Sequence, residues 1–401
     1  METFENYKTN MGNQKQADSF NINFYILKIL GVYPLENKSK LYTYYSIIFL
    51  LLFNTAFVFL CTVNLFFLPM RIDDFIEELI FYFTEFSVLC KVFTFTILRP
   101  QKIREILSIL ESEIFQPDTD KTIEIITYTK AFYWRYWKMV FGFSAIANAA
   151  HVFTPLLTHF IMKTELVLPV STFSFLPDDV KSANIYAIYM YQTIGIHFTM
   201  HYAVNVDTFF SGLMIFMIAQ LEVLGEKLRT ITDDFKGDKI KPFDDTDLIK
   251  KLNQAIIHHD RVIKYCGVIE EIFTLCIFVQ FGVASCVICI CLYRFTLPAT
   301  YQYYIFLTTY SIVMIIVILV PCFFGTRIMD KSCMISHAIY SCDWTWTTKR
   351  FKTSMLFLAE RANRPLTITG MKMFQISLIT FTSIMNSAYS FFTLLRHMQT
   401  R

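Results

Sequence analysis

Seven long apolar runs constrain the fold of this chain more than any other feature of its sequence. A helix needs about 20 apolar residues to cross the ~30 Å hydrocarbon core of a bilayer. The runs cover residues 41–68, 75–98, 132–161, 184–219, 266–293, 301–325 and 367–395. Because lipid offers no hydrogen-bonding partners for open backbone groups, we expect each run to be a helix. The sequence therefore predicts an all-α membrane protein with seven transmembrane helices.

The composition excludes the main alternatives to a membrane protein. Hydrophobic residues make up 54% of the chain and charged residues 17%, against about 25% charged residues in an ordinary soluble domain. The same numbers exclude a disordered chain. Eight of the ten cysteines lie inside the apolar runs, so we expect free thiols that pack as small apolar groups rather than a disulfide framework.

Lysine and arginine are distributed unequally between the two sides that seven spans create. Segments 1–40, 99–131, 220–265 and 326–366 together carry 26 of these residues, and the opposite side carries 6. Cytoplasmic loops are enriched in positive charge. We therefore expect a multi-pass membrane protein with a cytoplasmic N-terminus and an extracellular C-terminus.

The segments on the basic side have helical patterns of their own. Leucines recur at helical spacing after residue 220, and a second helix is predicted to begin near Asp244, after a polar turn at 235–243, and to run into the fifth span. A further amphipathic helix is expected over 344–363. These patterns predict a cytoplasmic helical anchor bundle.

The expected regions are 1–40, a cytoplasmic N-terminal segment; 41–219, spans one to four with an outer ligand cavity; 220–265, anchor helices; 266–325, spans five and six; 326–366, anchor helices; and 367–401, the last span and a short extracellular tail.

The sequence contains few motifs that are typical of enzymes. The chain has no nucleotide-binding loop and no nucleophile motif, so we expect neither an enzyme nor a cofactor. The His258-His259-Asp260 cluster places neighbouring side chains on different helix faces, which argues against a metal site. His197 and His201 lie one turn apart, where lining an internal cavity is the favoured interpretation. The basic residues are spread over loops, so nucleic acid is not an expected partner.

Polar residues form one stripe along the last predicted span. The spacing i, i+4, i+7 and i+11 places them on one helix face, and Gln375 and Thr382 extend the stripe. The stripe consists of Asn386, Ser390, Thr393 and His397. Beside it, Leu394 and Met398 are apolar residues able to close a pore by dewetting. Repeated around an axis by several subunits, such a stripe would line a pore. From periodicity alone, helix–helix packing through small polar residues is the favoured interpretation and pore lining the alternative.

Aromatic residues gather in the outer halves of several spans, together with a few polar groups. Small-molecule sites have this mixture of apolar walls and sparse polar groups. The candidate ligand residues are Tyr82, Phe83, Phe86, Asn148, His151, Thr154, Tyr189, Thr193, His197, Tyr304 and Leu307. Ordinary packing of a helix bundle explains the same composition equally well.

The C-terminal third of the chain resembles the signature of insect odorant receptors. The matching residues are Ala338-Ile-Tyr-Ser-Cys-Asp-Trp344, Arg350, Arg364-Pro365-Leu366, Gly370, Ser377-Leu378, Thr380-Phe381 and Tyr389-Ser-Phe-Phe-Thr-Leu-Leu395. The segment 257–264, with Gln280 further on, is similar to that family's approach to its fifth span.

This resemblance implies a ligand-gated, non-selective cation channel assembled as a tetramer. It implies a tuning subunit that binds a volatile organic ligand and combines with an odorant co-receptor in olfactory sensory neurons. The last span would line the pore, with the hydrophobic gate at Leu394 and Met398, and the odorant pocket would lie in the outer half of the bundle. The basic tail, with Arg396, His397 and Arg401, would oppose cations at the outer mouth.

Two other functions compete with this interpretation. A gustatory receptor of the same superfamily would share the fold and the pore but would need a more polar pocket. A secondary transporter is the second alternative, although transporters commonly show repeat symmetry and broken helices, and this sequence has no internal repeat.

Overall fold

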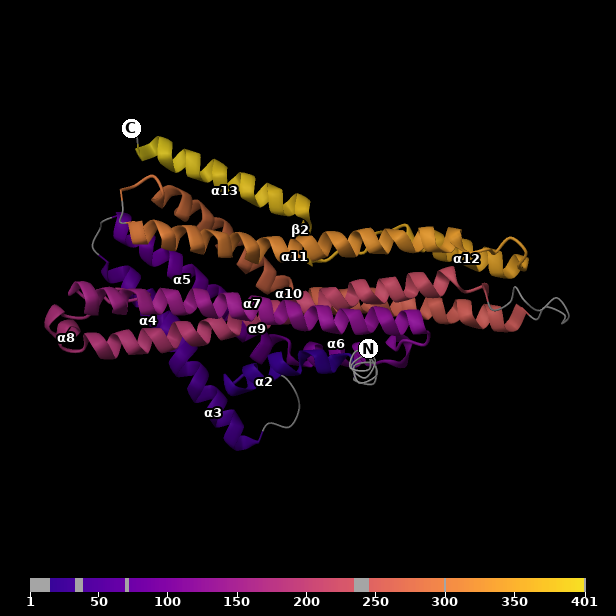
Figure 1. Cartoon of the computed structure of the whole chain (residues 1–401), viewed down its shortest axis with the longest axis horizontal. Helices are drawn as coiled ribbons and strands as arrows, with labels where there is room; N and C mark the ends of the chain where they lie inside the picture. The colour runs from indigo at the N-terminus through magenta and orange to yellow at the C-terminus, as the bar shows by residue number, and fades with distance from the viewer. Residues whose placement is uncertain (1–14, 33–38, 69–71, 234–244, 299–300, 400–401) are drawn as a thin grey trace.

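A computed structural model describes residues 15–32, 39–68, 72–233, 245–298 and 301–399. Long helices run side by side along the longest axis of the molecule (Figure 1). The short helices of the N-terminal region lie along one side of this bundle, and the last helix lies along the opposite edge (Figure 1). The predicted polar turn at 235–243, and residues 1–14 and 33–38 of the N-terminal segment, lie outside the described residues.

The seven predicted spans correspond to helical segments of the structure. The helices and strands are η1 (Ala17–Phe20), α2 (Asn21–Ile29), α3 (Lys40–Leu50), η2 (Leu51–Thr55), α4 (Ala56–Phe67), α5 (Ile72–Phe93), η3 (Thr94–Leu98), α6 (Pro100–Leu110), η4 (Glu113–Phe115), α7 (Asp120–Met162), α8 (Asp178–Ala183), α9 (Ile185–Arg229), α10 (Asp245–Arg294), α11 (Tyr301–Ser341), α12 (Lys349–Ala362), β1 (Thr369–Gly370), β2 (Phe374–Gln375) and α13 (Leu378–Gln399). Within the described residues, six helices are long and apolar enough to span a membrane, and α13 corresponds to the seventh predicted span.

Helix α9 forms the centre of the bundle. It packs against α7, α10 and α11, and 89% of its most apolar window is buried inside the chain. Buried polar groups dock the N-terminal helix α2 onto it: the Asn23 amide donates to Thr208 Oγ1 at 2.8 Å and to the Asn205 carbonyl at 3.0 Å. The Tyr133 hydroxyl in turn donates to Asn23 Oδ1 at 2.8 Å. The satisfied polar groups make α2 part of the core, which the polar start of the sequence did not predict.

Local sequence explains where several helices begin. Ser39, Thr119 and Thr348 are N-cap residues, and each side chain accepts a hydrogen bond from a backbone N–H in the first turn of α3, α7 or α12. Pro100 opens α6 at a position where its missing N–H costs nothing. As predicted, the helix after the polar turn continues without a break into the fifth span as α10. The periodicity after residue 220 is the end of α9 rather than a separate helix.

The predicted start of the last span at residue 367 is wrong, and so is the placement of Gln375 on its polar stripe. Residues 369–375 form a small antiparallel hairpin in which Thr369 pairs with Gln375, and the helix begins only at Leu378. The Thr369 hydroxyl donates to Glu270 Oε1 at 2.5 Å, and the hairpin turn bonds to α10 through the Met371 N–H. These contacts with α10 hold the segment extended, and they are not visible in local hydropathy.

Candidate functional site

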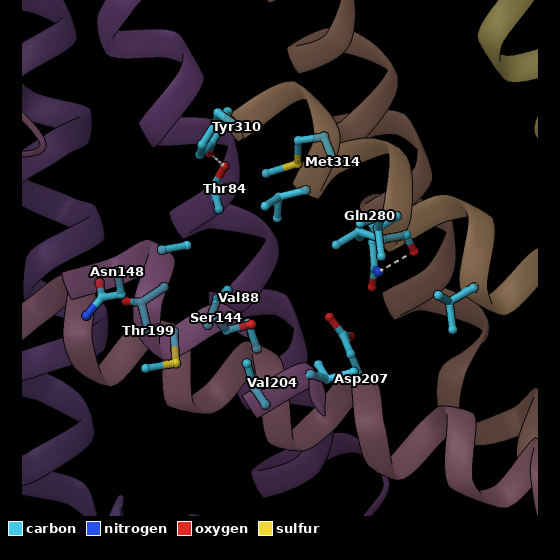
Figure 2. A pocket seen from close by; sticks show the side chains of 18 of the residues that line it. Thr84, Val88, Ser144, Asn148, Thr199, Val204, Asp207, Gln280, Tyr310 and Met314 are labelled. Atoms are coloured by element: carbon cyan, nitrogen blue, oxygen red, sulfur yellow. Dashed lines mark hydrogen bonds between the residues drawn. The ribbon is translucent and has the colours of Figure 1, made fainter. Parts of the chain in front are cut away.

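A cavity of about 290 Å³ lies on the face of α9 between α7 and α11, with α5 and α10 closing its other sides. The lining is mostly apolar. Figure 2 shows side chains from several helices directed into this space. Along α9 the lining extends from Ile196 to Ser211, about 22 Å at 1.5 Å per residue. The cavity is therefore long and narrow, and its volume is close to the lower end of the ~300–1,000 Å³ found for small-molecule sites.

Aromatic rings pack against one another at the two ends of the cavity. At the outer end Phe81 stacks on Phe306, with ring centroids 5.7 Å apart, and His151 packs at 5.3 Å from each ring. His151 Nε2 lies 2.8 Å from the carbonyl oxygen of Pro169. At the inner end Tyr136 of α7 meets Phe324 of α11 edge to face. These contacts join helices α5, α7 and α11, and the space between them stays unfilled by the chain's own side chains.

Polar groups along the walls mostly bond to one another or to the backbone. The hydroxyls of Thr84 and Tyr310 form a short hydrogen bond between α5 and α11 (Figure 2). The Gln280 amide donates to the carbonyl of Val317 at 3.4 Å (Figure 2). The hydroxyl of Thr199 donates to the carboxyl of Glu85, a residue with 2% of its surface exposed. These bonds satisfy buried polar groups and hold the walls in place.

Two of the eleven predicted ligand residues, Asn148 and His151, line this cavity. Tyr82 and Phe86 stack on each other outside it, and Phe86 is exposed. Phe83 packs against the main hydrophobic core, and Leu307 is completely buried in that core. The periodicity of α5 therefore directs its aromatic side chains toward different surroundings, and only Phe81 of that group reaches the cavity.

The other predicted ligand residues lie around the outer ends of α7, α9 and α11. The Tyr189 hydroxyl bonds to the carbonyl of Val152, and the Tyr304 hydroxyl bonds to a carbonyl at 2.7 Å. Thr154 is exposed and bonds within its own helix, whereas Thr193 Oγ1 is buried without a partner. A role for these residues in ligand binding stays a prediction.

The predicted histidine pair forms a small polar cluster beside the cavity. His197 Nε2 lies 3.1 Å from His201 Nε2, and His197 Nδ1 lies 3.3 Å from the Asn148 amide. His258 is buried in α10 and bonds to Gln220 at 3.0 Å. Within the part of the chain that the structure describes, no group of three His, Cys, Asp or Glu side chains is arranged to hold a metal ion. None of the ten cysteines, all of which lie in the described residues, forms a disulfide bond.

The polar stripe of α13 faces away from the chain's own core. Asn386, Ser390, Thr393 and His397 are exposed, as is Leu394 with 55% of its surface accessible. An open groove runs along this face, lined by Ile379, Thr382, Ser383, Asn386, Ser387, Ser390 and Phe391. Helix α13 packs on α10 and α11 through its opposite side. Met398 belongs to α13, but its side chain lies outside the described part of the structure.

An ion pair at the inner end of the cavity was not among the predicted site residues. Lys91 Nζ lies 2.7 and 2.8 Å from the two carboxylate oxygens of Asp207, and Asp207 lines the cavity. Both residues interrupt apolar runs, where charged side chains are costly unless they are paired. Opposite charges in two separate spans were the signal available in the sequence, but the pairing itself depends on how α5 and α9 pack.

Comparisons with known proteins agree along most of the chain. Residues 71–389 match the family described as 7tm Odorant receptor. Odorant receptor 67a of Drosophila melanogaster is 22% identical over 389 residues, with 92% of this chain and 93% of the relative covered, and Odorant receptor 59a of the same species is 24% identical over 399 residues, with 93% and 95% covered.

The fold is also similar to a solved receptor structure. The olfactory receptor OR5 of Machilis hrabei, solved in complex with eugenol, superposes with a TM-score of 0.81 at 18% identity, covering 94% of this chain and 97% of the other. The resemblance inferred from the C-terminal motifs is therefore confirmed, and so is the expected seven-helix fold. The chain belongs to the 7tm odorant receptor family.

Proposed function

We propose that this chain is the tuning subunit of an insect odorant receptor. It binds a small, mostly apolar volatile in the cavity on α9 and opens a non-selective cation pore lined by α13. The family match favours this function over the gustatory receptor and the transporter. The observation that carries the proposal is the position of α11, which lines the cavity and also contacts the start of α13.

The contact between α11 and α13 supplies a path from ligand to pore. The cavity-lining part of α11 ends at Pro321. About one turn further on, Gly325 lies against the backbone of Ile376, and Thr326 accepts a hydrogen bond from the Leu378 N–H at 2.9 Å. A ligand opens the pore only if it binds the open state more tightly than the closed one. Displacement of α11 by a bound ligand would move the first turn of α13 directly.

The cavity suits a ligand with a large apolar part. Apolar burial contributes ~25 cal/mol per Å² before the costs of association. Asn148 and His151 are the predicted polar residues at its outer part. The Machilis receptor was solved in complex with eugenol. A small molecule of this kind is a suitable first probe for the present chain.

The pore in this proposal needs more than one subunit. The exposed stripe of Asn386, Ser390, Thr393 and His397 would face water at a shared axis, with Leu394 and Met398 as the gate. Odorant co-receptor subunits are the proposed partners, in a hetero-oligomer, most simply a tetramer. The proposed location is the plasma membrane of olfactory sensory neurons.

Expression with and without the co-receptor tests this function. Currents are recorded against eugenol and a panel of volatile esters, alcohols, aldehydes and terpenoids, with receptor at the surface measured in parallel. We expect ligand-dependent cation currents that require the co-receptor. Silence across the panel at normal surface delivery would contradict the proposal.

A cavity-filling variant locates the ligand site. Ala203 lines the cavity, whereas Ala187, on the same helix, is exposed and does not. Ala203→Leu fills the space that the ligand needs, and overpacking of this kind costs about 1–3 kcal/mol. We expect the half-maximal ligand concentration to rise about tenfold or more, while Ala187→Leu leaves it unchanged. Equal responses of the two variants would place the ligand elsewhere.

A further inference from the structure

At the inner end of the cavity, the acidic member of an ion pair is accessible and the basic member is not. Lys91 is almost completely buried, with 4% of its side chain accessible, whereas 31% of the Asp207 side chain is accessible. The carboxylate therefore lies between the ammonium group and the cavity. In Figure 2 the Asp207 carboxylate points into the space toward Gln280. A ligand at this end of the cavity meets carboxylate oxygens rather than the lysine.

Asp207 is one of two carboxylates in the wall of the cavity. The lining includes Asp207 and Glu85 but neither a lysine nor an arginine. Glu85 accepts from Thr199 at 2.7 Å and has 2% of its surface exposed, so it offers the cavity little area. The Gln280 amide is directed at a backbone carbonyl. The wall thus offers hydrogen-bond acceptors to a ligand, and of its two carboxylates that of Asp207 is the more accessible.

We infer that Asp207 binds the hydroxyl of an alcohol or phenol, with the apolar part of the ligand lying along α9 toward Phe81 and Phe306. This inference rests on the proposed function, because it names the class of ligand that the same cavity takes. A carboxylate forms stronger hydrogen bonds than a neutral acceptor. From Asp207 to Ile196 the cavity follows eleven residues of α9, about 16 Å, which matches an extended chain with a polar group at one end.

The pairing of Lys91 with Asp207 determines whether a neutral or a cationic ligand is favoured at this end of the cavity. Lys91 already neutralises Asp207, with Nζ 2.7 and 2.8 Å from the two oxygens. A protonated amine would bring an additional charge out of water into a mostly apolar space, and this charge would lack a counter-ion of its own. A hydroxyl donates a hydrogen bond without that cost. The ion pair therefore favours alcohols and phenols over amines.

An isomeric pair of ligands tests the inference. Hexanol and methyl pentyl ether have the same atoms and similar apolar volume, but only the alcohol donates a hydrogen bond; hexylamine tests the cationic class. Binding is measured as the ligand-dependent shift in thermal unfolding of the purified receptor, and currents are recorded with the co-receptor. We expect hexanol to bind about 10- to 100-fold more tightly than the ether, as one hydrogen bond to a charged group predicts, and also more tightly than hexylamine.

Variants connect this preference to the ion pair. Asp207→Asn alone would leave the Lys91 charge buried without its partner, which can prevent folding. The double variant Lys91→Met, Asp207→Leu removes both charges, and such apolar replacements of buried pairs are often neutral for stability. We expect it to bind both isomers equally. The matched control is Lys331→Met, Glu222→Leu, which removes the 2.6 Å ion pair between α11 and α9 outside the cavity, and it should keep the preference for the alcohol.

The outcomes separate this inference from the proposed function. Equal binding of the two isomers to the unmodified receptor, binding of neither, tighter binding of hexylamine, or an unchanged preference in the Lys91→Met, Asp207→Leu variant would each overturn the role of Asp207. Currents evoked by ligands of the panel without any preference for alcohols would leave the receptor function intact and refute only the inference. Selective binding of hexanol without currents would support the inference and contradict gating.

Discussion

The α-carbon of Gly325 in α11 lies directly against the carbonyl oxygen of Ile376, two residues before α13 begins. A β-carbon at Gly325 would overlap that oxygen, which is a backbone atom and cannot turn aside as a side chain can. Close approach of two backbones is one of the few requirements that only glycine meets. The segment that leads into the last helix is therefore in direct backbone contact with α11.

Replacing Gly325 tests this attachment. Gly325→Ala should push the Ile376 segment away from α11, and overpacking of this kind costs about 1–3 kcal/mol. We expect the maximal ligand-evoked current per surface receptor to fall about tenfold, with ligand binding retained. Gly282→Ala is the matched control, because a β-carbon there has nothing within 4 Å. Normal currents in Gly325→Ala would show that this contact does not transmit gating.

The exposed position of Leu394 allows a test of the proposed gate. Leu394→Ala shortens an apolar side chain that is 55% exposed in the single chain, and a wider, wetter constriction should leak. We expect the current without ligand to rise several-fold, measured with the co-receptor and normalised to surface receptor.

A second exposed aliphatic residue serves as the control for the gate. Ile312 on α11 is 47% exposed and does not line the cavity, so Ile312→Ala should keep the basal current of the unmodified receptor. If Leu394→Ala behaves in the same way as this control, the gate lies elsewhere on α13.

A surface network joins α6 to α10 and predicts a pH dependence. Lys264 and Lys102 donate to the carboxylate of Glu105 at 2.9 and 3.0 Å, and Lys102 also pairs with Glu271 at 2.9 Å. The hydrogen bonds from Lys264, and then from Lys102, hold the pKa of Glu105 below its usual value. The folded protein therefore gains stability from Glu105 above the unfolded pKa of about 4.3, and loses it as the pH falls through the lower folded pKa.

Glu105→Gln should lower the melting temperature at pH 7 by about 1 °C, a small effect because the pair is solvent-exposed. The difference from the unmodified receptor should shrink as the pH falls below about 4.3, and it should vanish below the folded-state pKa of Glu105, where the carboxylate is protonated in both the folded and the unfolded state. Thermal unfolding of the purified receptor across this pH range measures the difference in melting temperature. Glu165→Gln, at an exposed loop position, is the control; an equal loss of stability in that variant would argue against the network.

Some of the ligand cavity was predictable and some was not. The polar groups in the outer half of the third span predict Asn148 and His151 as ligand residues, and both line the cavity. The aromatic residues of the second span predict Tyr82 and Phe86 as ligand residues, yet Phe81 is the aromatic residue of α5 that reaches the cavity. Hydropathy identifies a span, but it does not say which face of the helix meets a gap and which meets a neighbour.

The hairpin before α13 is a second feature that local hydropathy does not predict. Residues 367–377 are apolar enough to continue the last span, and they were predicted to be helical. Bonds from Thr369 to Glu270 and from Met371 to Thr274 hold them extended beside α10 instead. Partners about 100 residues away in sequence decide this conformation, and a local pattern cannot include them.

Length and hydropathy along the chain were enough to predict seven helical spans and the polar stripe of α13, since each is a property of a residue and its near neighbours, and the orientation expected from the charge distribution stays a prediction. Packing alone decided that Lys91 meets Asp207, that Gly325 meets Ile376, and that the cavity opens on α9. These relationships join residues of different segments, and the first two join residues more than 50 positions apart in the sequence. They exist only once the helices have packed against one another.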